Sequence, residues 1–376
     1  MKNMTILYIF TFGYSLKTWQ LSGTLEKELE IFKKINEKYN TKFIFLTYGN
    51  NDDLSLEISN KNIKIIPLFG NKSIPKNKFL LFSLSVYFVL KNKNLFKEVE
   101  IIQQNQLNGS WLAVLAKFLY KKPYFLRTGY DTYRFSIYEK KSILKRFGFL
   151  FLTNLNFAFS DLITVTSKSD YVFSKKYFIK PKLIKVRPNW VVKKKLPKHS
   201  LRSSYKILSV GRLENQKNYS KIINEFSNSK FEIDIVGTGK NLDNLQKLAK
   251  EKNTKINFLG HVNNTDLQSL YPKYTFYVST SLFEGNPKTV LEAMSHGCVV
   301  LISNIDNHKE LVNNSENGFL IDLKDNFYKK LINIIDDTSV DFDAISKNAS
   351  NFVYKNNNIE KLIDKTQDDY LFLCKK

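Results

Sequence analysis

The chain has 376 residues, which is enough for two domains that each bury a core of their own. Hydrophobic residues make up 43% of it and charged residues 25%, a composition typical of a folded protein, so we expect a folded chain and not a disordered one. The net charge of +23 indicates either an anionic partner, such as a membrane, a lipid-linked phosphate or a nucleic acid, or a compositional drift that enriches Lys.

The absence of several sequence patterns argues against further classes of protein. No stretch has the interleaved aromatic and arginine side chains of a nucleic-acid reader or the spacing of a zinc finger, so we expect no nucleic-acid partner. Cys298 and Cys374 are too few for a disulfide framework, which indicates a reducing compartment. Residues 1–12 predict a first strand, because no signal-peptide cleavage site follows. The apolar stretches 79–90 and 147–159 are too short and interrupted to span a bilayer.

The first half of the chain alternates between strand and helix patterns. Residues 5–12 form a near-continuous apolar run, typical of a parallel strand covered on both faces. We expect a loop over residues 13–19 and a helix over residues 21–39, where apolar side chains recur at helical spacing. Further strands are predicted at residues 42–48, 63–69, 100–104, 123–127 and 162–166. The alternation predicts an α/β fold with a doubly wound parallel sheet, whose ligands bind at the carboxyl ends of the strands.

Polar residues follow two of these strand ends. Ser15, Lys17 and Trp19 follow the first strand, either as substrate contacts or as parts of a solvated loop. Asp131 follows the strand at residues 123–127 and either faces the reaction centre or caps a local turn. Arg127, in the same segment, is either a ligand contact or the structural partner of an acid.

A basic segment precedes an apolar one near the middle of the chain. Lys140, Lys141, Lys145 and Arg146 come directly before the apolar residues 147–152. This pattern is typical of a basic amphipathic helix at a membrane surface, and equally of a helix packed on the sheet with a solvated Lys edge.

The strand and helix pattern restarts after a segment rich in Pro and Lys, where we place a linker over residues 188–204. Helices are expected to begin near Asn218, Leu242 and Thr265, and a last helix is predicted over residues 359–373. The strands between them are predicted at residues 206–210, 231–236, 256–259, 275–279, 299–303, 309–312 and 318–321. The sequence thus predicts an N-terminal domain, residues 1–187, and a second Rossmann-like domain, residues 205–355.

Two glutamates lie at one strand-to-helix crossing of the second half. Residues 274–280 predict a buried strand, and a helix is expected to begin near Asn286 and to end before Gly297. Glu284 then precedes the helix and Glu292 lies about two turns inside it, an axial offset of roughly 10–12 Å. That offset suits a nucleotide-sugar, with one carboxylate on the sugar, the other on the ribose, and the helix N-terminus facing the diphosphate.

Two cations lie just past another strand end. Arg212 and Lys217 are five positions apart, so both can reach one pyrophosphate, the guanidinium with bidentate contacts and the ammonium as a mobile charge. Preorganised cations stabilise the charge that develops on a departing diphosphate, and they can take the place of a metal ion. Asp341-Phe-Asp343, the one Asp-x-Asp pattern, lies at a helix start beyond the second sheet, so we expect no metal site.

Three motifs in this order resemble one known family. Glu284-Gly-x-Pro-x4-Glu292, behind Val210-Gly211-Arg212-Leu213-x4-Lys217 and Ile235-Val-Gly237-x-Gly239, resembles the donor-binding domain of glycosyltransferase family 4. The resemblance implies the GT-B fold, in which two Rossmann-like domains face a central cleft and a C-terminal helix, here within residues 356–376, crosses back to the first domain. It also implies retaining transfer from a UDP- or GDP-linked sugar, which is a substrate, so no cofactor is expected.

The resemblance further implies roles for individual residues. Glu284 would contact the donor sugar and Glu292 the ribose, while Asp131 takes the place of the polar group that faces the reacting carbon. The catalytic set is thus Asp131, Arg212, Lys217 and Glu284, and the acceptor side is Ser15, Lys17, Trp19 and Arg127. The donor-binding set comprises Arg212, Lys217, Glu284 and Glu292 with Gly211, Gly237, Gly239, His261, Val262, Gly285, Asn286, Pro287, Lys288 and Thr289.

At two places in the sequence, the roles that the family's residues have do not carry over directly. The backbone at His261 and Val262 is expected to border the base, with the His261 side chain in a structural role. The family's Gly-rich turn after the first strand is represented only by Gly13 and Gly23, so the N–H groups of Ser15 and Leu16 are the candidates for a phosphate contact there.

The sequence therefore predicts a metal-independent, retaining hexosyltransferase that moves a sugar from a nucleotide-sugar to a glycan or lipid-linked acceptor. We expect it to serve surface polysaccharide biosynthesis (capsule, lipopolysaccharide or exopolysaccharide) in the cytoplasm, including the cytoplasmic face of an anionic membrane as a peripheral site. Two alternatives stay open: a catalytically silent, carbohydrate-binding partner subunit of a transferase, and a GT-B sugar-nucleotide epimerase.

Overall fold

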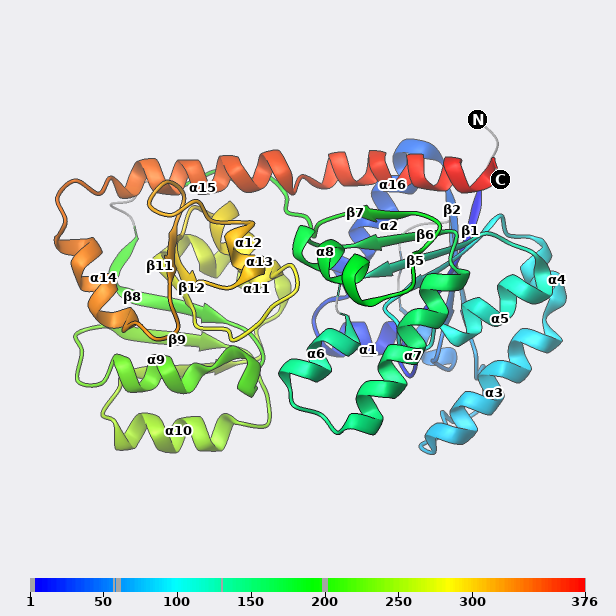
Figure 1. Cartoon of the computed structure of the whole chain (residues 1–376), viewed down its shortest axis with the longest axis horizontal. Coiled ribbons are helices and arrows are strands. Elements are labelled where there is room, and N and C mark those ends of the chain that lie inside the picture. The colour runs from blue at the N-terminus through cyan, green and yellow to red at the C-terminus, as the bar shows by residue number, and fades with distance from the viewer. Residues whose placement is uncertain (1–3, 57, 59–61, 130, 198–201, 376) are drawn as a thin grey trace. The chain divides into compact units, whose positions relative to one another are not determined.

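The computed structural model describes residues 4–56, 58, 62–129, 131–197 and 202–375, with the backbone alone for Ser204. The chain divides into two compact units (Figure 1). The first unit comprises Met1–Arg187 and Glu360–Lys376, and the second comprises Pro188–Ile359. The segment predicted as a linker, residues 188–204, thus belongs to the second unit. Its residues 198–201 lie outside the described part of the chain.

The first unit is built on a seven-stranded parallel sheet with the order β3-β2-β1-β4-β5-β6-β7. The strands are β1 (Thr5–Ile9), β2 (Lys42–Thr47), β3 (Ile63–Pro67), β4 (Ile101–Asn105), β5 (Tyr124–Thr128), β6 (Leu162–Val165) and β7 (Ile184–Val186). The last four residues of β1 are buried, as expected of a strand that helices cover on both faces. The edge strand β7 is short and only half-buried, and the sequence pattern of these residues did not predict a strand.

Helices surround this sheet, and one of them, α1, lies mainly where a loop was predicted. They are α1 (Leu16–Leu21), α2 (Leu25–Tyr39), α3 (Lys78–Lys91), α4 (Lys93–Lys97), α5 (Trp111–Tyr120), α6 (Thr132–Tyr138), α7 (Ile143–Phe159), α8 (Lys168–Tyr177) and α16 (Ile359–Cys374). The predicted loop over residues 13–19 was wrong from Leu16 onward, because Ser15 and Thr18 form a capping box that starts α1. Gly23, at a φ of +66°, then separates α1 from α2.

The second unit holds a six-stranded parallel sheet with the order β10-β9-β8-β11-β12-β13. The strands are β8 (Ser203–Val210), β9 (Glu232–Val236), β10 (Ile256–Gly260), β11 (Tyr274–Ser279), β12 (Val299–Ser303) and β13 (Phe319–Ile321). The helices are α9 (Tyr219–Glu225), α10 (Leu242–Glu251), α11 (Asn264–Leu270), α12 (Lys288–Ser295), α13 (Asp306–Lys309), α14 (Phe327–Asp336) and α15 (Phe342–Asn356), with the 3-10 turns η3 (Asn215–Lys217) and η4 (Tyr271–Lys273).

The strand predicted at residues 309–312 was wrong. The backbone N–H groups of Leu311 and Val312 both donate to the carbonyl of His308, so this segment is a turn that follows α13. Leu311 and Val312 are buried on one side of the sheet, which explains the apolar signal that resembled a strand.

The core of the second unit lies on both faces of its sheet. Along β12, Val299 and Leu301 pack in one cluster of buried residues, and Val300 and Ile302 pack in the other. The alternation follows the two-residue period of a strand, and helices on both faces explain why these strands read as unbroken apolar runs.

Both units are thus parallel α/β sheets of the kind predicted. In the part of the chain that the structure describes, no helix combines the length and the apolar character needed to cross a bilayer.

Candidate active site

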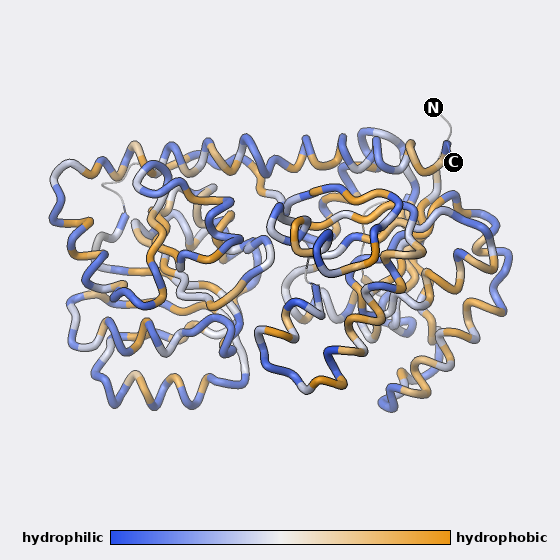
Figure 2. Tube along the Cα trace, in the orientation of Figure 1, coloured by the Kyte–Doolittle hydropathy of each residue, from blue (hydrophilic) through white to orange (hydrophobic). Residues whose placement is uncertain are grey.

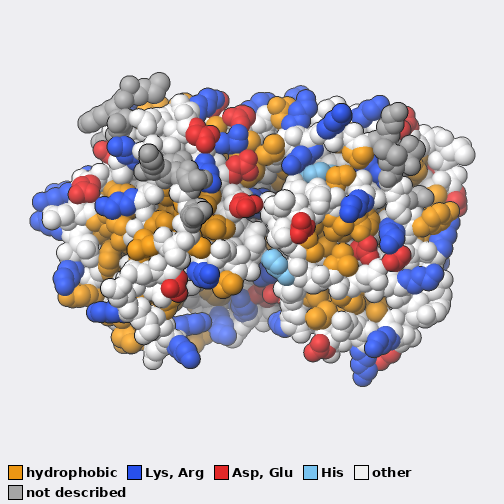
Figure 3. Space-filling view, turned by 180° about the vertical axis from the view of Figure 1, so that it is seen from behind, with side chains coloured by type: hydrophobic (Ala, Val, Ile, Leu, Met, Phe, Trp, Pro, Cys, Tyr) orange, Lys and Arg blue, Asp and Glu red, His pale blue; other side chains and the backbone are white. Residues whose placement is uncertain are grey.

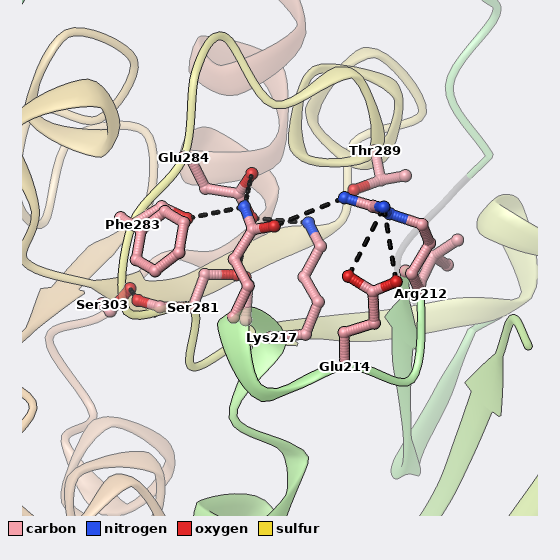
Figure 4. A network of polar contacts seen from close by, with 12 residues as sticks. Arg212, Glu214, Lys217, Ser281, Phe283, Glu284, Thr289 and Ser303 are labelled. Carbon is pink, nitrogen blue, oxygen red and sulfur yellow. Dashed lines mark hydrogen bonds and ion pairs between the residues drawn. The ribbon is translucent and has the colours of Figure 1, made fainter. Parts of the chain in front are cut away.

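The strand order of the second unit reverses between β8 and β11. The chain goes from β8 to β9 and β10 on one side, and from β11 to β12 and β13 on the other. In open α/β sheets, ligands bind outside the carboxyl ends of the two strands at such a point. The loop after β8 carries Arg212 and Lys217, and the loop after β11 carries Glu284, so the fold brings these predicted residues to one place (Figure 4).

A network of short contacts holds the Glu284 side chain. The Nζ of Lys217 lies 2.5 Å from Oε1 of Glu284, and both side chains are largely buried. The hydroxyl of Ser281 donates to the same oxygen at 2.6 Å. Gln216 donates from Nε2 to the carbonyl of Phe283 at 2.8 Å and to Oε2 of Glu284 at 3.4 Å. The carboxylate is therefore fixed through Oε1, while Oε2 receives one long bond and keeps capacity for a ligand hydroxyl.

Glu284 is ionised at neutral pH. Burial alone would raise its pKa, but the positive charge of Lys217 and the hydrogen bonds from Lys217 and Ser281 together hold the pKa below its ordinary value. An ionised carboxylate only accepts hydrogen bonds, which suits the hydroxyl groups of a sugar.

A second layer of polar groups supports the loop that carries Glu284. Ser303 donates from its hydroxyl to the carbonyl of Ser281 at 2.6 Å. The Nδ1 of His308 lies 2.7 Å from the carbonyl oxygen of Ser303, to which it donates. Burial lowers the pKa of His308 to about 4, so the imidazole is neutral at pH 7. Its Nε2 is buried and has no hydrogen-bond partner among the described residues.

Sequence reasoning missed Gln216, Ser281, Ser303 and His308. Each is an isolated polar residue near a strand end, and no spacing distinguishes it from the many other Ser, Gln and His positions of the chain. The available signal is position alone, since all four lie in segments that follow or end β8, β11 and β12.

Arg212 differs from Lys217 in its surroundings. Its side chain is 61% exposed, and its guanidinium makes only long contacts, 3.4 Å to Glu214 and 3.5 Å to Oε1 of Gln216. A guanidinium held this loosely retains donors for a bidentate contact with a phosphate group.

Three glycines allow the loops after β8 and β9 to touch. A Cβ on Gly237, whose φ is +139°, would lie 2.0 Å from the carbonyl oxygen of Gly211, and a Cβ on Gly239 would lie 2.5 Å from the carbonyl oxygen of Leu213. A Cβ on Gly211 would lie 2.9 Å from Cε of Lys217. The glycine motif therefore serves loop packing that places Lys217 beside the sheet edge. A ligand contact by these glycines stays a prediction.

The helix that carries Glu292 starts later than predicted. α12 begins at Lys288 with Pro287 at the N-cap, so Glu292 lies in its second turn and not two turns inside it. Oε2 of Glu292 accepts a hydrogen bond from the hydroxyl of Tyr271 at 3.1 Å. The Thr289 hydroxyl accepts one from Tyr277 at 3.0 Å.

The turn before α12 is tied to the start of the second unit. The backbone N–H of Asn189 donates to Oδ1 of Asn286 at 2.9 Å, and the Asn189 side chain donates to the carbonyl of Asn286 at 2.6 Å. Asn286 is thus buried in a structural contact, whereas Gly285 and Lys288 are partly exposed. At the end of β10, the His261 side chain is exposed and Val262 packs against the core.

The predicted acceptor-side residues of the first unit have structural contacts. Ser15 caps α1, and the Trp19 ring lies 4.4 Å from the ring of Phe10. The side chain of Lys17 is exposed, and its backbone N–H donates to the buried carboxylate of Asp53 at 2.9 Å. An acid of the protein therefore already lies at the start of α1, which disfavours a phosphate at this turn. The acceptor roles of these residues stay predictions.

Asp131 is the N-cap residue of α6. Its Oδ1 accepts a hydrogen bond from the backbone N–H of Arg134 at 2.6 Å, and burial raises its pKa to about 7. Arg127 lies on β5, where burial lowers its pKa and the negative charge of Glu28 opposes that shift. No contact in the structure tests a role of either residue at a reacting carbon.

The Asp-x-Asp pattern is likewise a helix cap. Oδ1 of Asp341 accepts a hydrogen bond from the N–H of Ala344 at 2.9 Å, at the start of α15. Within the described ranges, no group of three or more His, Cys, Asp or Glu side chains is arranged to hold a metal ion.

Comparisons with known proteins support a glycosyltransferase. A model of the family described as "Glycosyl transferases group 1" matches residues 192–358. The UDP-Gal:alpha-D-GlcNAc-diphosphoundecaprenol alpha-1,3-galactosyltransferase of Escherichia coli is 28% identical, over 93% of this chain and 94% of its own. The N-acetylgalactosamine-N,N'-diacetylbacillosaminyl-diphospho-undecaprenol 4-alpha-N-acetylgalactosaminyltransferase of Campylobacter jejuni is 27% identical, over 73% of this chain and 76% of its own.

A solved structure shows the same fold. The Anabaena protein Alr3699/HepE, in complex with UDP and glucose, has a TM-score of 0.75 to this chain at 16% identity, covering 98% of this chain and 99% of its own.

Proposed function

We propose that this chain, a GT-B glycosyltransferase whose residues 192–358 match the group 1 glycosyl transferases, moves a sugar from a UDP-linked donor to a saccharide on a polyprenyl diphosphate. The names of the two relatives support the acceptor class, since both contain a diphosphoundecaprenol-linked saccharide. The UDP-Gal in one name and the UDP in the Anabaena complex support the donor class.

The observation that carries the proposal is the contact between Lys217 and Glu284 beside the exposed guanidinium of Arg212. A nucleotide-sugar combines hydroxyl groups, which need acceptors, with a diphosphate, which needs cations. Oε2 of Glu284 supplies an acceptor, and Arg212 with Lys217 supplies two positive charges on the adjacent loop. The three groups thus match the sugar end and the phosphate end of one molecule.

In this account the cations act on the leaving group. As the bond between the sugar and the diphosphate breaks, negative charge grows on the phosphate oxygen, and the fixed charges of Arg212 and Lys217 stabilise it. We therefore infer a transfer that does not depend on a divalent metal ion and persists in a chelator.

We also infer that the anomeric configuration is retained, as in family 4. Glu284 accepts bonds from Lys217 and Ser281 on one oxygen, and its pKa is low, so it is poorly suited to act as a general base or a nucleophile. This supports attack of the acceptor hydroxyl from the face of the leaving diphosphate, whose oxygen takes the proton.

The proposed site of action is the cytoplasmic face of a membrane, in the synthesis of a surface polysaccharide. A polyprenyl-linked acceptor is held in the bilayer, so an enzyme without a described membrane-spanning helix must meet it from the surface.

The test is transfer by the purified protein in EDTA, with UDP-galactose, UDP-N-acetylgalactosamine, UDP-glucose, UDP-N-acetylglucosamine and GDP-mannose offered separately. The acceptor is a synthetic polyprenyl diphosphate that carries N-acetylglucosamine. The proposal expects a disaccharide product from at least one UDP-sugar by mass spectrometry, with an α linkage by NMR. Transfer from GDP-mannose alone would overturn the UDP-linked donor, and a product with inverted configuration would overturn retention. No product from any donor would overturn the proposed transfer.

A further inference from the structure

Three neighbouring helices of the first unit contain no Asp or Glu. They are α3, α5 and α7, with the sequences KFLLFSLSVYFVLK, WLAVLAKFLY and ILKRFGFLFLTNLNFAF. α5 contacts both α3 and α7, so the three helices form one layer of the unit (Figure 1). A layer without acids is unusual for the outside of a folded protein, where Asp and Glu normally accompany Lys.

α3 is apolar around its whole circumference, although only one side of it is covered. Its buried residues, Leu81, Ser85 and Val89, lie four positions apart and face the rest of the unit. The other sides are exposed and still carry large apolar side chains, including Phe79 at 77% exposure (Figure 2). A helix that is apolar all round normally lies in a protein core or a membrane.

The first half of α7 has the same character. Leu144 is 83% exposed, and Ile143, Phe147 and Phe151 are exposed as well. Burial of this helix begins only near its C-terminal half, at Thr153. We call the exposed apolar residues of these helices the apolar face; they are Phe79, Leu80, Phe82, Leu84, Tyr87 and Leu90 of α3, Phe118 and Leu119 of α5, and Ile143, Leu144, Phe147 and Phe151 of α7.

Cationic side chains lie at the ends of the helices that carry the apolar face, and Glu139, the acid ahead of α7, is paired with Lys141 at 2.7 Å. Lys78 and Lys91 lie at the two ends of α3, and Lys145 and Arg146 lie in the first turns of α7. On the face of the molecule drawn in Figure 3, Lys and Arg side chains are spread over the surface with Asp and Glu side chains among them. The distinguishing feature of the apolar face is therefore the absence of acids within its helices, in combination with exposed aromatic and aliphatic side chains.

We propose that the apolar face inserts into the surface of an anionic phospholipid bilayer. Exposed Phe and Leu side chains bury into the acyl boundary, while Lys and Arg beside them meet anionic headgroups, which is the chemistry of an interfacial basic amphipathic segment. A second copy of this chain is a poor occupant, because each chain carries a net charge of +23 and a cationic border would meet a cationic border. The inference names the surface for the membrane contact that the proposed function requires.

The experiment is flotation of the purified chain with extruded vesicles, either of phosphatidylglycerol with phosphatidylethanolamine or of phosphatidylcholine alone. The apolar variant combines Phe79→Ser with Phe147→Ser, and the matched control combines Val172→Ser with Ile179→Ser, two exposed apolar positions outside these helices. We expect the wild type and the control to float with anionic vesicles, and the partition coefficient of the apolar variant to fall roughly tenfold or more. Lys145→Glu with Arg146→Glu should abolish the preference for anionic over neutral vesicles.

Three results would overturn the inference. They are a wild type that stays in the buffer with both vesicle types, an apolar variant that floats like the wild type, and a wild-type dimer in light scattering that the apolar variant dissociates. All substituted residues are solvent-exposed except Arg146, which is partly buried, so melting temperatures are compared first. Flotation needs no turnover: an inactive chain that floats would contradict the proposed transfer reaction alone. An active chain that does not float would contradict this inference and the proposed site of action, and would leave the transfer reaction standing.

Discussion

Lys217 and Glu284, 67 positions apart in the sequence, are joined directly, with Nζ of the lysine 2.5 Å from Oε1 of the glutamate. The contact links the loop after β8 to the loop after β11, on the two sides of the point where the sheet order reverses. The cation assigned to the phosphates and the acid assigned to the sugar are therefore partners of each other. This coupling makes the position of one depend on the presence of the other.

The pair should be costly to break from either side. Lys217→Met leaves a buried carboxylate without its cation, and Glu284→Gln leaves a buried ammonium without its anion, so each is expected to lower the free energy of unfolding by about 3 kcal/mol. The double variant should lose clearly less free energy of unfolding than the two single variants lose in sum. Denaturant unfolding of the four proteins measures this.

The control for that cycle is Lys206→Met, which removes an exposed ion pair with Glu232. Its effect should stay below about 1 kcal/mol. Additive losses at Lys217 and Glu284 would show that the two side chains do not interact in solution.

Arg212→Ala should affect catalysis without affecting stability. The guanidinium is mostly exposed and makes only long contacts, so unfolding should change by less than about 0.5 kcal/mol. Because it is assigned to the departing diphosphate, kcat/KM for the donor should fall on the order of 100-fold, and Arg212→Lys should recover part of the loss. Steady-state kinetics checks this. The control is Glu214→Gln, which removes the acidic partner of Arg212 within the protein. An Arg212→Ala enzyme with unchanged kcat/KM would remove Arg212 from the site.

Asp131 should make stability depend on pH. Burial raises its pKa from 3.8 to about 7, so the folded chain keeps a proton that the unfolded chain releases. The stabilising contribution of the Asp131 carboxyl to the free energy of unfolding is thus present at low pH and is lost as the pH rises from about 4 to about 7. Asp131→Asn keeps the cap on α6 but does not titrate.

The unfolding free energy of Asp131→Asn, relative to the wild type, should therefore increase across this interval, by up to about 4 kcal/mol. Urea unfolding at pH 5 and pH 8 checks the sign. A difference between the two proteins that is the same at both pH values would mean that the Asp131 carboxyl is ionised throughout.

Gly237→Ala should destabilise the second unit. The added Cβ would lie 2.0 Å from the carbonyl oxygen of Gly211, which is backbone and cannot move away cheaply, and the φ of +139° disfavours any side chain. We expect a loss of at least about 2 kcal/mol. Gly148→Ala is the matched control, since its Cβ would have no atom within 4 Å and it lies inside α7. That variant should be as stable as the wild type or gain up to about 1 kcal/mol by thermal unfolding.

Strands covered on both faces were the most predictable part of the fold. β12 was expected at its observed bounds, because its four consecutive apolar residues, Val299 to Ile302, form the short unbroken run that is typical of a strand buried on both faces. Short segments were less predictable. The pair Leu311 and Val312 resembled a strand, yet the two residues are buried in a turn, and α1 depends on a capping box whose two hydroxyl residues also occur in loops.

The grouping of the candidate site residues was predictable from motifs. Arg212, Lys217 and Glu284 were selected from type and spacing, and the sheet places them on adjacent loops; their roles stay predictions. Their partners were not selected, because Gln216 and Ser281 act through a geometry that appears only when β8 and β11 lie side by side. Trp19 was selected because an aromatic residue near a strand end suits a sugar contact; its ring packs against Phe10, and its acceptor role stays a prediction.

The most direct test of the central claim is the turnover of Glu284→Gln with the donor and acceptor identified for the wild type, at a temperature where both proteins are folded. Glutamine keeps the shape of the side chain but loses the charge that binds Lys217 and the acceptor capacity proposed for the sugar. The account predicts that kcat/KM falls on the order of 100-fold or more, with the anomeric configuration of any residual product unchanged. A folded Glu284→Gln protein that transfers sugar at the wild-type rate would contradict it.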